Sequence, residues 1–246
     1  METQIPDRIT WNLKHYKQRM NWDCGLSCVL MCLSDDERQE ILKDVPKLCK
    51  EEGFGHSTWT IDLCYLFRSQ VPTISFNYTT ITLGVDSGYQ DEKYYSSILT
   101  KDNERINQRF QLSEQNNISV QKRSVSILEL VHHVANNGVC IVLTNANLLT
   151  CEICSSISCF SKHCKYTANV AKSLSCCTMK PPYQGHYVVV CGYILKEKKI
   201  IYRNPSYSDR MCVVPFDMFD DARTSYGTDE DVIFVDLEKD IRKEAT

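Results

Sequence analysis

The chain has 246 residues, of which 43% are apolar and 24% charged, and its formal net charge is -3. This length and apolar content allow a sizeable core, and they exclude a short peptide, a fibrous protein and a disordered tail. The 28 basic and 31 acidic residues create no field that would gather phosphates, so we expect no nucleic-acid partner. No apolar run approaches the roughly 18 residues that cross a bilayer, and the residues METQIPDRITWNLK lack the apolar stretch that is typical of a secretory signal. We expect a cytoplasmic protein that does not bind membranes.

The domain organisation is simple, because the sequence has no internal repeat, heptad run or long low-complexity linker. We therefore expect one folded domain over residues 11–237, with a cysteine-rich insertion at 150–178. Residues 1–10 and 238–246 are expected to be tails.

Helical patterns dominate the first half of the chain. Residues 24–33, CGLSCVLMCL, are apolar nearly all round, which predicts a buried central helix with Asp23 as its N-cap. A strand is expected between Pro72 and Leu83, where β-branched and aromatic residues are frequent. The other helices predicted here span 35–49, 58–68 after Ser57 or Thr58, 91–115, and 126–137 with Gly138 as a left-handed C-cap.

Strand patterns dominate the second half. Strands are predicted at 139–144, 186–195, 199–205 and 231–237, with a short helix at 215–223. The polar turn KEKK joins the second and third of these strands as a hairpin. Helices followed by a mostly antiparallel sheet indicate a segregated α+β domain.

Cys24 occupies a position at which a helix would favour the reactive thiolate form of its side chain. It begins the predicted buried helix, and a helix N-terminus presents unpaired N–H groups and about half a positive charge, which favours thiolate over thiol. We expect Gly25 to let a substrate approach the backbone, and Gln18 to bring its side-chain amide beside the Cys24 N–H as a second oxyanion donor. Taken alone, Cys24 is equally compatible with a small buried hydrophobic residue.

A thiolate in acyl transfer needs a base, and histidine has a suitable pKa. Among six histidines, His186 has the most suitable context, because it follows Gly185 and begins the strand HYVVVCGY. The predicted hairpin returns through IIYRNP and brings Asn204 near His186. An amide oxygen that accepts the second imidazole N–H would fix the tautomer and the ring plane.

The runs QRMNWDCGLSC, GHYVVVCGY and YRNPS resemble the papain-like cysteine peptidases, in particular the bacteriocin-processing double-glycine peptidase group. The resemblance implies a papain-like fold, in which N-terminal helices pack on a mostly antiparallel sheet. It also implies an oxyanion glutamine at Gln18, a nucleophile at Cys24, a general base at His186 and an orienting residue at Asn204, where that group more often has aspartate. The implied activity is cleavage of a peptide or protein amide, without a catalytic cofactor.

The longer match, which adds WTIDLCYL, TLGVD and ARTSYGTDED, resembles the animal guanylyl cyclase domain-containing protein family over almost the whole chain. Nucleotide cyclisation of the familiar type needs paired carboxylates, two metal ions and cationic groups, and we find no phosphate-binding glycine loop. Asp229, Glu230 and Asp231 adjoin a predicted strand and are interpreted as a solvated loop. The sequence therefore favours a thiol hydrolase. Two alternatives stay open: a guanylyl cyclase, and an inactive adaptor that binds peptides through the same cleft.

Six of the 14 cysteines lie within residues 151–177. The Cys-x-x-Cys pair of Cys151 and Cys154 lets two thiolates reach one ion, and Cys164 and Cys176 complete a candidate tetrahedral zinc site. The unequal gaps match no named zinc finger, so free thiols or a redox pair is the alternative. We expect a structural zinc ion here, in a segment that leads directly to His186.

Overall fold

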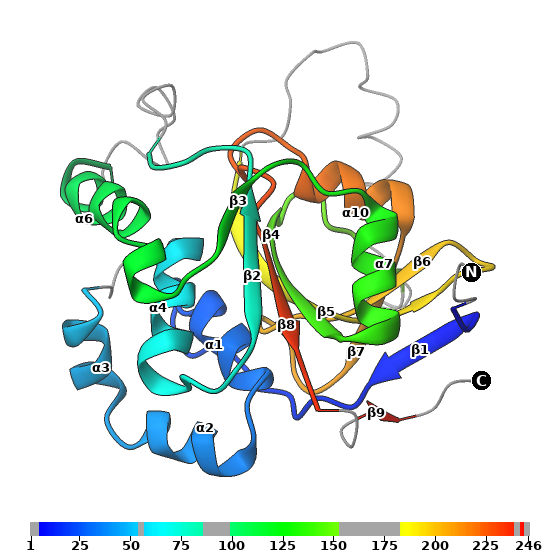
Figure 1. Ribbon diagram of the computed structural model, residues 1–246. Helices are drawn as coiled ribbons and strands as arrows, with labels where there is room; N and C mark the ends of the chain where they lie inside the picture. The colour runs from blue at the N-terminus through cyan, green and yellow to red at the C-terminus, as the bar shows by residue number, and fades with distance from the viewer. Residues whose placement is uncertain (1–4, 54–56, 86–98, 153–182, 239–241, 244–246) are drawn as a thin grey trace, which may run out of the picture.

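The computed structural model describes residues 5–53, 57–85, 99–152, 183–238 and 242–243 (Figure 1). Most of the described helices come early in the chain, before the long strands of the sheet. They are α1 (Cys24–Met31), α2 (Asp35–Leu42), α3 (Val45–Glu51), α4 (Thr60–Gln70), α6 (Leu99–Gln111), the short 3-10 helix η2 (Glu114–Asn116), α7 (Ile127–Asn136) and α10 (Phe216–Arg223).

The described strands form one nine-stranded sheet. They are β1 (Arg8–Trp11), β2 (Phe76–Thr80), β3 (Val120–Lys122), β4 (Gly138–Asn145), β5 (Gly185–Ile194), β6 (Lys199–Arg203), β7 (Met211–Pro215), β8 (Val232–Asp236) and β9 (Arg242–Lys243). The order is β3-β2-β8-β4-β5-β1-β9, and β6 and β7 branch from β5. Of the described pairs, only β2 with β3 is parallel. The predicted α+β class, with helices on a mostly antiparallel sheet, is confirmed.

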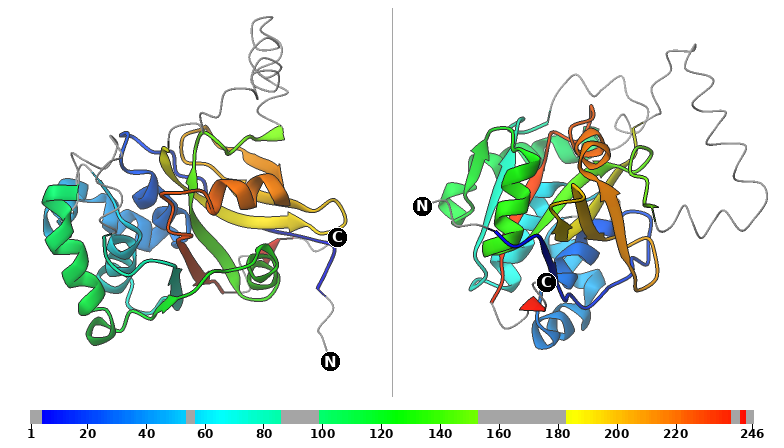
Figure 2. Two further views of the ribbon diagram at one scale, coloured as in Figure 1. Left: turned by 90° about the horizontal axis from the view of Figure 1, so that it is seen from above. Right: turned by 90° about the vertical axis from the view of Figure 1, so that its right-hand side faces the viewer.

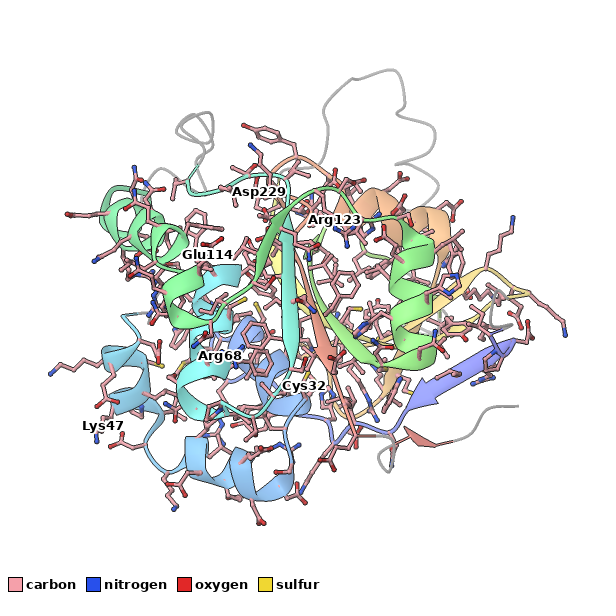
Figure 3. The ribbon with its side chains drawn as sticks, viewed as in Figure 1. Cys32, Lys47, Arg68, Glu114, Arg123 and Asp229 are labelled. Carbon is pink, nitrogen blue, oxygen red and sulfur yellow. The ribbon has the colours of Figure 1, made fainter. Side chains whose placement is uncertain are left out.

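Helices cover the sheet from two sides (Figures 1 and 2). Helix α1 packs on β5 and α4 packs on β8, whereas α7 packs on β4 and β5, and α10 on β4, β6 and β7. All eight residues of α1 are buried, as its nearly uniform apolar pattern predicts. Cys32, which follows α1, lies near the centre of the molecule in Figure 3. Because α1 packs on β5, its first residue, Cys24, is held against that strand.

Three predicted helices differ from the observed ones. Residues 91–98 of the helix predicted at 91–115 lie outside the described residues, and α6 ends at Gln111. The helix predicted at 35–49 is two helices, because Asp44 leaves the helical region and accepts the Lys47 N–H at 3.0 Å as the N-cap of α3. The helix predicted at 58–68 begins at Thr60, and its N-cap is Trp59 rather than Ser57 or Thr58. The Trp59 N–H donates to the Asp62 carboxylate at 3.1 Å.

The prediction for Gly138 is wrong. It is the first residue of β4 and does not cap α7 in the left-handed conformation; Asn137 ends that helix with right-handed geometry. A Cβ at position 138 would lie 2.1 Å from the Val235 carbonyl oxygen of β8. Glycine is needed there for the close approach of two strands.

Four strands lie where no strand was predicted, and one of them, β3, pairs with β2. β1 begins inside the segment expected as an N-terminal tail and pairs with β5, while β9, within the segment expected as a C-terminal tail, pairs with β1. β7 pairs with β6 and widens the hairpin. Short strands such as these take their conformation from the neighbours with which they pair, which a local pattern does not show.

Candidate active site

The loop before α1 is shaped by Asp23. This residue is the N-cap by position, but its side chain makes no capping hydrogen bond with the helix. Its two carboxylate oxygens instead accept the backbone N–H groups of Arg19 and Met20, each at 3.0 Å. The expected capping contact is therefore absent, and the carboxylate holds the loop that leads from Gln18 to Cys24.

His186 and Asn204 meet where β5 begins and β6 ends. The His186 Nε2 lies 2.8 Å from the Asn204 Oδ1, and both side chains are buried. The same Oδ1 accepts the Ser206 backbone N–H at 2.9 Å, which identifies that amide atom as the oxygen. Nε2 must therefore donate its proton to Asn204, and Nδ1 keeps a free lone pair. This is the tautomer that a general base needs.

Ser206 connects this pair to Gln18. The Ser206 hydroxyl donates its single proton to the Gln18 Oε1 at 2.8 Å, so toward His186 Nε2, 3.5 Å away, it can only accept. The Gln18 Nε2 donates to the Met20 carbonyl at 2.8 Å, and the Gln18 backbone N–H donates to the Pro205 carbonyl at 2.9 Å. The loop before Cys24 is thus fastened to the loop that carries Asn204. The role of Gln18 as an oxyanion donor stays a prediction.

Cys24 is buried where α1 meets β5. Burial raises the pKa of the Cys24 thiol above its ordinary value, and it outweighs the backbone N–H groups of Tyr187, Gly25 and Cys24 itself, which lower that pKa. The expectation that the helix N-terminus makes Cys24 a thiolate is therefore reversed in this closed site. The Cys24 sulfur lies beside the backbone N–H of Tyr187, the residue that follows His186 in β5. The side chains of Cys24 and His186 form no hydrogen bond with each other.

Burial also acts on His186. It lowers the pKa of the imidazole, and the hydrogen bond to Asn204 opposes that shift only in part. A neutral thiol and a neutral imidazole are therefore the resting forms. In this state the ring can accept the thiol proton as the sulfur attacks.

Gly25 allows close packing around the start of α1. A Cβ at this position would lie 3.1 Å from the methyl groups of Leu63 and 3.2 Å from the Tyr187 ring. The absence of a side chain lets α1 approach α4 and β5 closely. Gly25 thus helps to place Cys24, and its expected role in substrate approach stays a prediction.

A cavity of about 260 Å³ adjoins Cys24. Its lining includes the aromatic residues Trp22, Trp59 and Tyr187 and the acidic residues Asp229 and Asp231. Figure 3 shows Asp229 on the loop that leads into β8. We name this cavity, which Cys24 also lines, the acidic pocket.

Asp231 is the residue that sequence reasoning missed. It was interpreted as part of a solvated loop, but only 6% of it is exposed. Its carboxyl group accepts the Tyr78 hydroxyl at 2.8 Å and is hydrogen-bonded to Thr60, whose hydroxyl lies 2.9 Å from that of Tyr187. Burial, reinforced by Asp229, raises the pKa of Asp231 to about 7. Its position immediately before an apolar strand was the available signal, since strand starts often enter the core.

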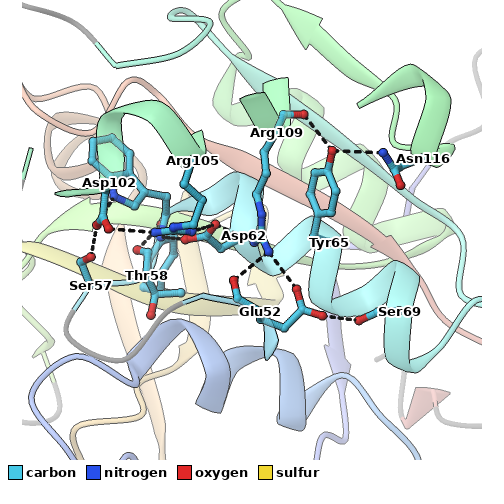
Figure 4. Close-up of polar contacts among 12 residues, drawn as sticks. Glu52, Ser57, Thr58, Asp62, Tyr65, Ser69, Asp102, Arg105, Arg109 and Asn116 are labelled. Atoms are coloured by element: carbon cyan, nitrogen blue, oxygen red, sulfur yellow. Dashed lines mark hydrogen bonds and ion pairs between the residues drawn. The ribbon is translucent and has the colours of Figure 1, made fainter. Parts of the chain in front are cut away.

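Residues 57–60, which form one wall of the acidic pocket, are held in place by side chains of α6 (Figure 4). Asp102 accepts the Ser57 hydroxyl, and also the Trp59 indole N–H at 3.1 Å. Below it, the fully buried Asp62 of α4 is paired with Arg105 and Arg109 of α6. These contacts fix the aromatic wall of the acidic pocket.

The structure leaves the predicted zinc site untested. Cys151 is buried, whereas Cys154, Cys164 and Cys176 lie outside the described residues. Among the residues that are described, no three His, Cys, Asp or Glu side chains group in a way that could hold a metal ion. In the same part of the chain, no helix has the length and apolar character needed to span a membrane.

The fold and the site define an α+β protein in which a helix with a cysteine at its N-terminus packs on the strand that carries a histidine, and this histidine is hydrogen-bonded to an asparagine at the end of the next strand. Residues 13–235 match the family described as Guanylylate cyclase, so the chain belongs to that family, as predicted. Over 236 residues it is 32% identical to Guanylyl cyclase 1 of Arabidopsis thaliana, an alignment that covers 95% of this chain and 79% of that relative. The fold is also similar to the crystal structure of a putative C39-like peptidase from Bacillus anthracis. That match has a TM-score of 0.47 and 15% identity, and covers 94% of this chain and 98% of the other.

Proposed function

We propose that the protein is a thiol hydrolase that cleaves a peptide or protein amide. The observation that carries the proposal is the His186–Asn204 hydrogen bond of 2.8 Å at the start of β5, the strand on which the Cys24 helix packs. It supports the proposal because it fixes the tautomer of an imidazole at the start of the strand that Cys24 contacts through the Tyr187 N–H.

The reaction follows from the neutral forms of the two groups. Cys24 sulfur attacks the amide carbonyl carbon while His186 Nδ1 takes the thiol proton, and the same proton passes to the departing amine. A thioester remains, and water that gives a proton to His186 hydrolyses it, which restores the thiol. The Cys24 N–H and the Gln18 amide are the proposed donors to the oxyanion.

Selective alkylation tests this proposal. At neutral pH we expect iodoacetamide to label Cys24 faster than the other cysteines, as resolved by peptide mass spectrometry, because the proposed mechanism gives Cys24 a positioned base in His186. His186→Ala should abolish the selectivity. His132→Ala, an exposed histidine on α7, is the matched control and should leave it unchanged.

Two other results would redirect the interpretation. Uniform labelling in the wild type would favour a binding protein without hydrolase activity. A nucleotide product that forms from GTP and survives Cys24→Ala would favour the cyclase activity named for the plant relative.

A further inference from the structure

The acidic pocket combines two features that recognise cations. Its walls present the aromatic side chains of Trp22, Trp59 and Tyr187, whose faces attract ammonium and guanidinium groups. Its lining also includes two acidic residues, Asp229 and Asp231.

Among the described residues, no lysine or arginine forms an ion pair with the buried acid Asp231. Its carboxyl group is hydrogen-bonded to the hydroxyl groups of Tyr78 and Thr60, and the Thr80 hydroxyl also acts on it. A carboxylate has about four lone-pair sites, so these contacts leave capacity for a ligand. Buried carboxylates are otherwise paired, since an isolated charge in the interior is costly. By contrast, Asp62 on α4 is equally buried and has two arginines.

The size and charge of the acidic pocket limit the kinds of ligand that it can bind. Its volume of about 260 Å³ lies below the range of roughly 300–1,000 Å³ typical of sites for whole small molecules, so it suits one side chain. Two acidic groups would repel phosphates and carboxylates. A cationic side chain fits both limits.

We propose that the acidic pocket binds a lysine or arginine side chain of the peptide substrate, beside the amide that Cys24 attacks. The inference rests on the proposed function for the identity of the reaction, and on the pocket itself for the charge of the ligand. Asp231 supplies the opposite charge, and the aromatic walls exclude water and stack on the alkyl stem or guanidinium plane.

The test compares two thiol reagents of opposite charge. Aminoethyl methanethiosulfonate is cationic, and sulfonatoethyl methanethiosulfonate is anionic. Their rates of reaction at Cys24 are measured by mass spectrometry and divided by their rates with N-acetylcysteine. We expect the cation to be favoured by about tenfold or more, as in clefts that concentrate one sign of charge. Both reagents depend equally on the thiolate, so the ratio can also be measured in His186→Ala, independently of hydrolase activity.

Two variants test which carboxyl group causes the preference for the cationic reagent. Asp231→Asn should bring the ratio close to that in solution, and Asp229→Asn should lower it in part. Asparagine tolerates the positive φ of 49° at position 229, so the second variant keeps the loop. An unchanged ratio in both variants, or no preference in the wild type, would overturn the proposal.

A binding measurement separates ligand classes. N-acetyl-arginine amide should slow the labelling of Cys24 by iodoacetamide, and its neutral counterpart N-acetyl-citrulline amide should not. Equal protection by the two, or protection by guanosine monophosphate alone, would also contradict the proposal. Failure of the arginine ligand together with His186-dependent labelling would leave the hydrolase standing and remove only the cationic specificity.

Discussion

Replacing Asp231 by asparagine should make the protein more stable at alkaline pH. The side chain is buried against Tyr78, Thr60 and Cys64, and the other charged group that acts on it is Asp229. Its pKa rises from 3.8 to about 7, so the folded protein binds this proton more tightly than the unfolded chain does. The stabilisation that this proton provides is complete at pH values below the pKa of Asp231 in the unfolded chain. It is lost as the pH rises through the pKa of Asp231 in the folded protein.

The magnitude follows from the two pKa values. A tenfold change in proton affinity is worth about 1.4 kcal/mol, so the full effect is about 4 kcal/mol. Between pH 5 and pH 8 the linkage relation gives a loss of about 2.5 kcal/mol in the free energy of unfolding. Asparagine resembles the protonated acid in shape and hydrogen bonding and does not titrate. The difference between variant and wild type should grow by this amount over the same interval.

Urea unfolding at pH 5 and pH 8 measures the effect. Groups common to both proteins cancel in the difference, and Asp221→Asn on the exposed face of α10 serves as a surface control, expected within about 0.5 kcal/mol at both pH values. Asp229→Asn should give a shallower pH dependence, because Asp229 raises the pKa of Asp231. A variant Asp231→Asn that loses stability equally at both pH values would refute the reasoning, since the carboxylate would then be stabilising.

Asn204→Ala should slow alkylation of the candidate nucleophile by about a hundredfold, because His186 loses the acceptor that sets its tautomer. Asn204→Asp should keep the hydrogen bond and add a negative charge that raises the pKa of His186, so the acidic limb of the alkylation profile should move to higher pH; an unmoved limb would argue against His186 as the base. Gly25→Ala should destabilise the fold by about 1–2 kcal/mol, measured by urea unfolding, because its Cβ would press on Leu63 and Tyr187; unchanged stability would show that the helix can shift freely. The cysteine-rich insertion should bring about one zinc ion per chain by elemental analysis, and a folded, metal-free preparation would contradict that prediction.

The local sequence pattern predicted much of the fold and the chain order of the candidate site residues. The apolar run of α1, the hairpin through β5 and β6, and the place of His186 at a strand start are all expressed within a few neighbouring residues. Hairpin pairing then brings Asn204 beside His186 whatever the rest of the chain does. For this reason the hydrogen bond between them was expected from residue order alone.

Asp231 shows what lay beyond local pattern. Thr60 comes from α4, Tyr78 from β2 and Tyr187 from β5, and their convergence on one carboxyl group depends on how the helices dock on the sheet. In the sequence the same residue stands in an acidic triplet, which is typical of an exposed loop. Burial is a property of the whole packing arrangement, so the acidic pocket had no counterpart in the sequence.

The residue types, their order and their start positions on a helix and a strand were determined by the sequence, because hydrophobic periodicity and chain connectivity act over short distances. The protonation of Cys24, the role of Gly25 and the charge of the cavity beside the thiol were decided by tertiary structure. Each of these depends on desolvation and close contact between elements far apart in the chain, and such free energies exist only once the core has formed.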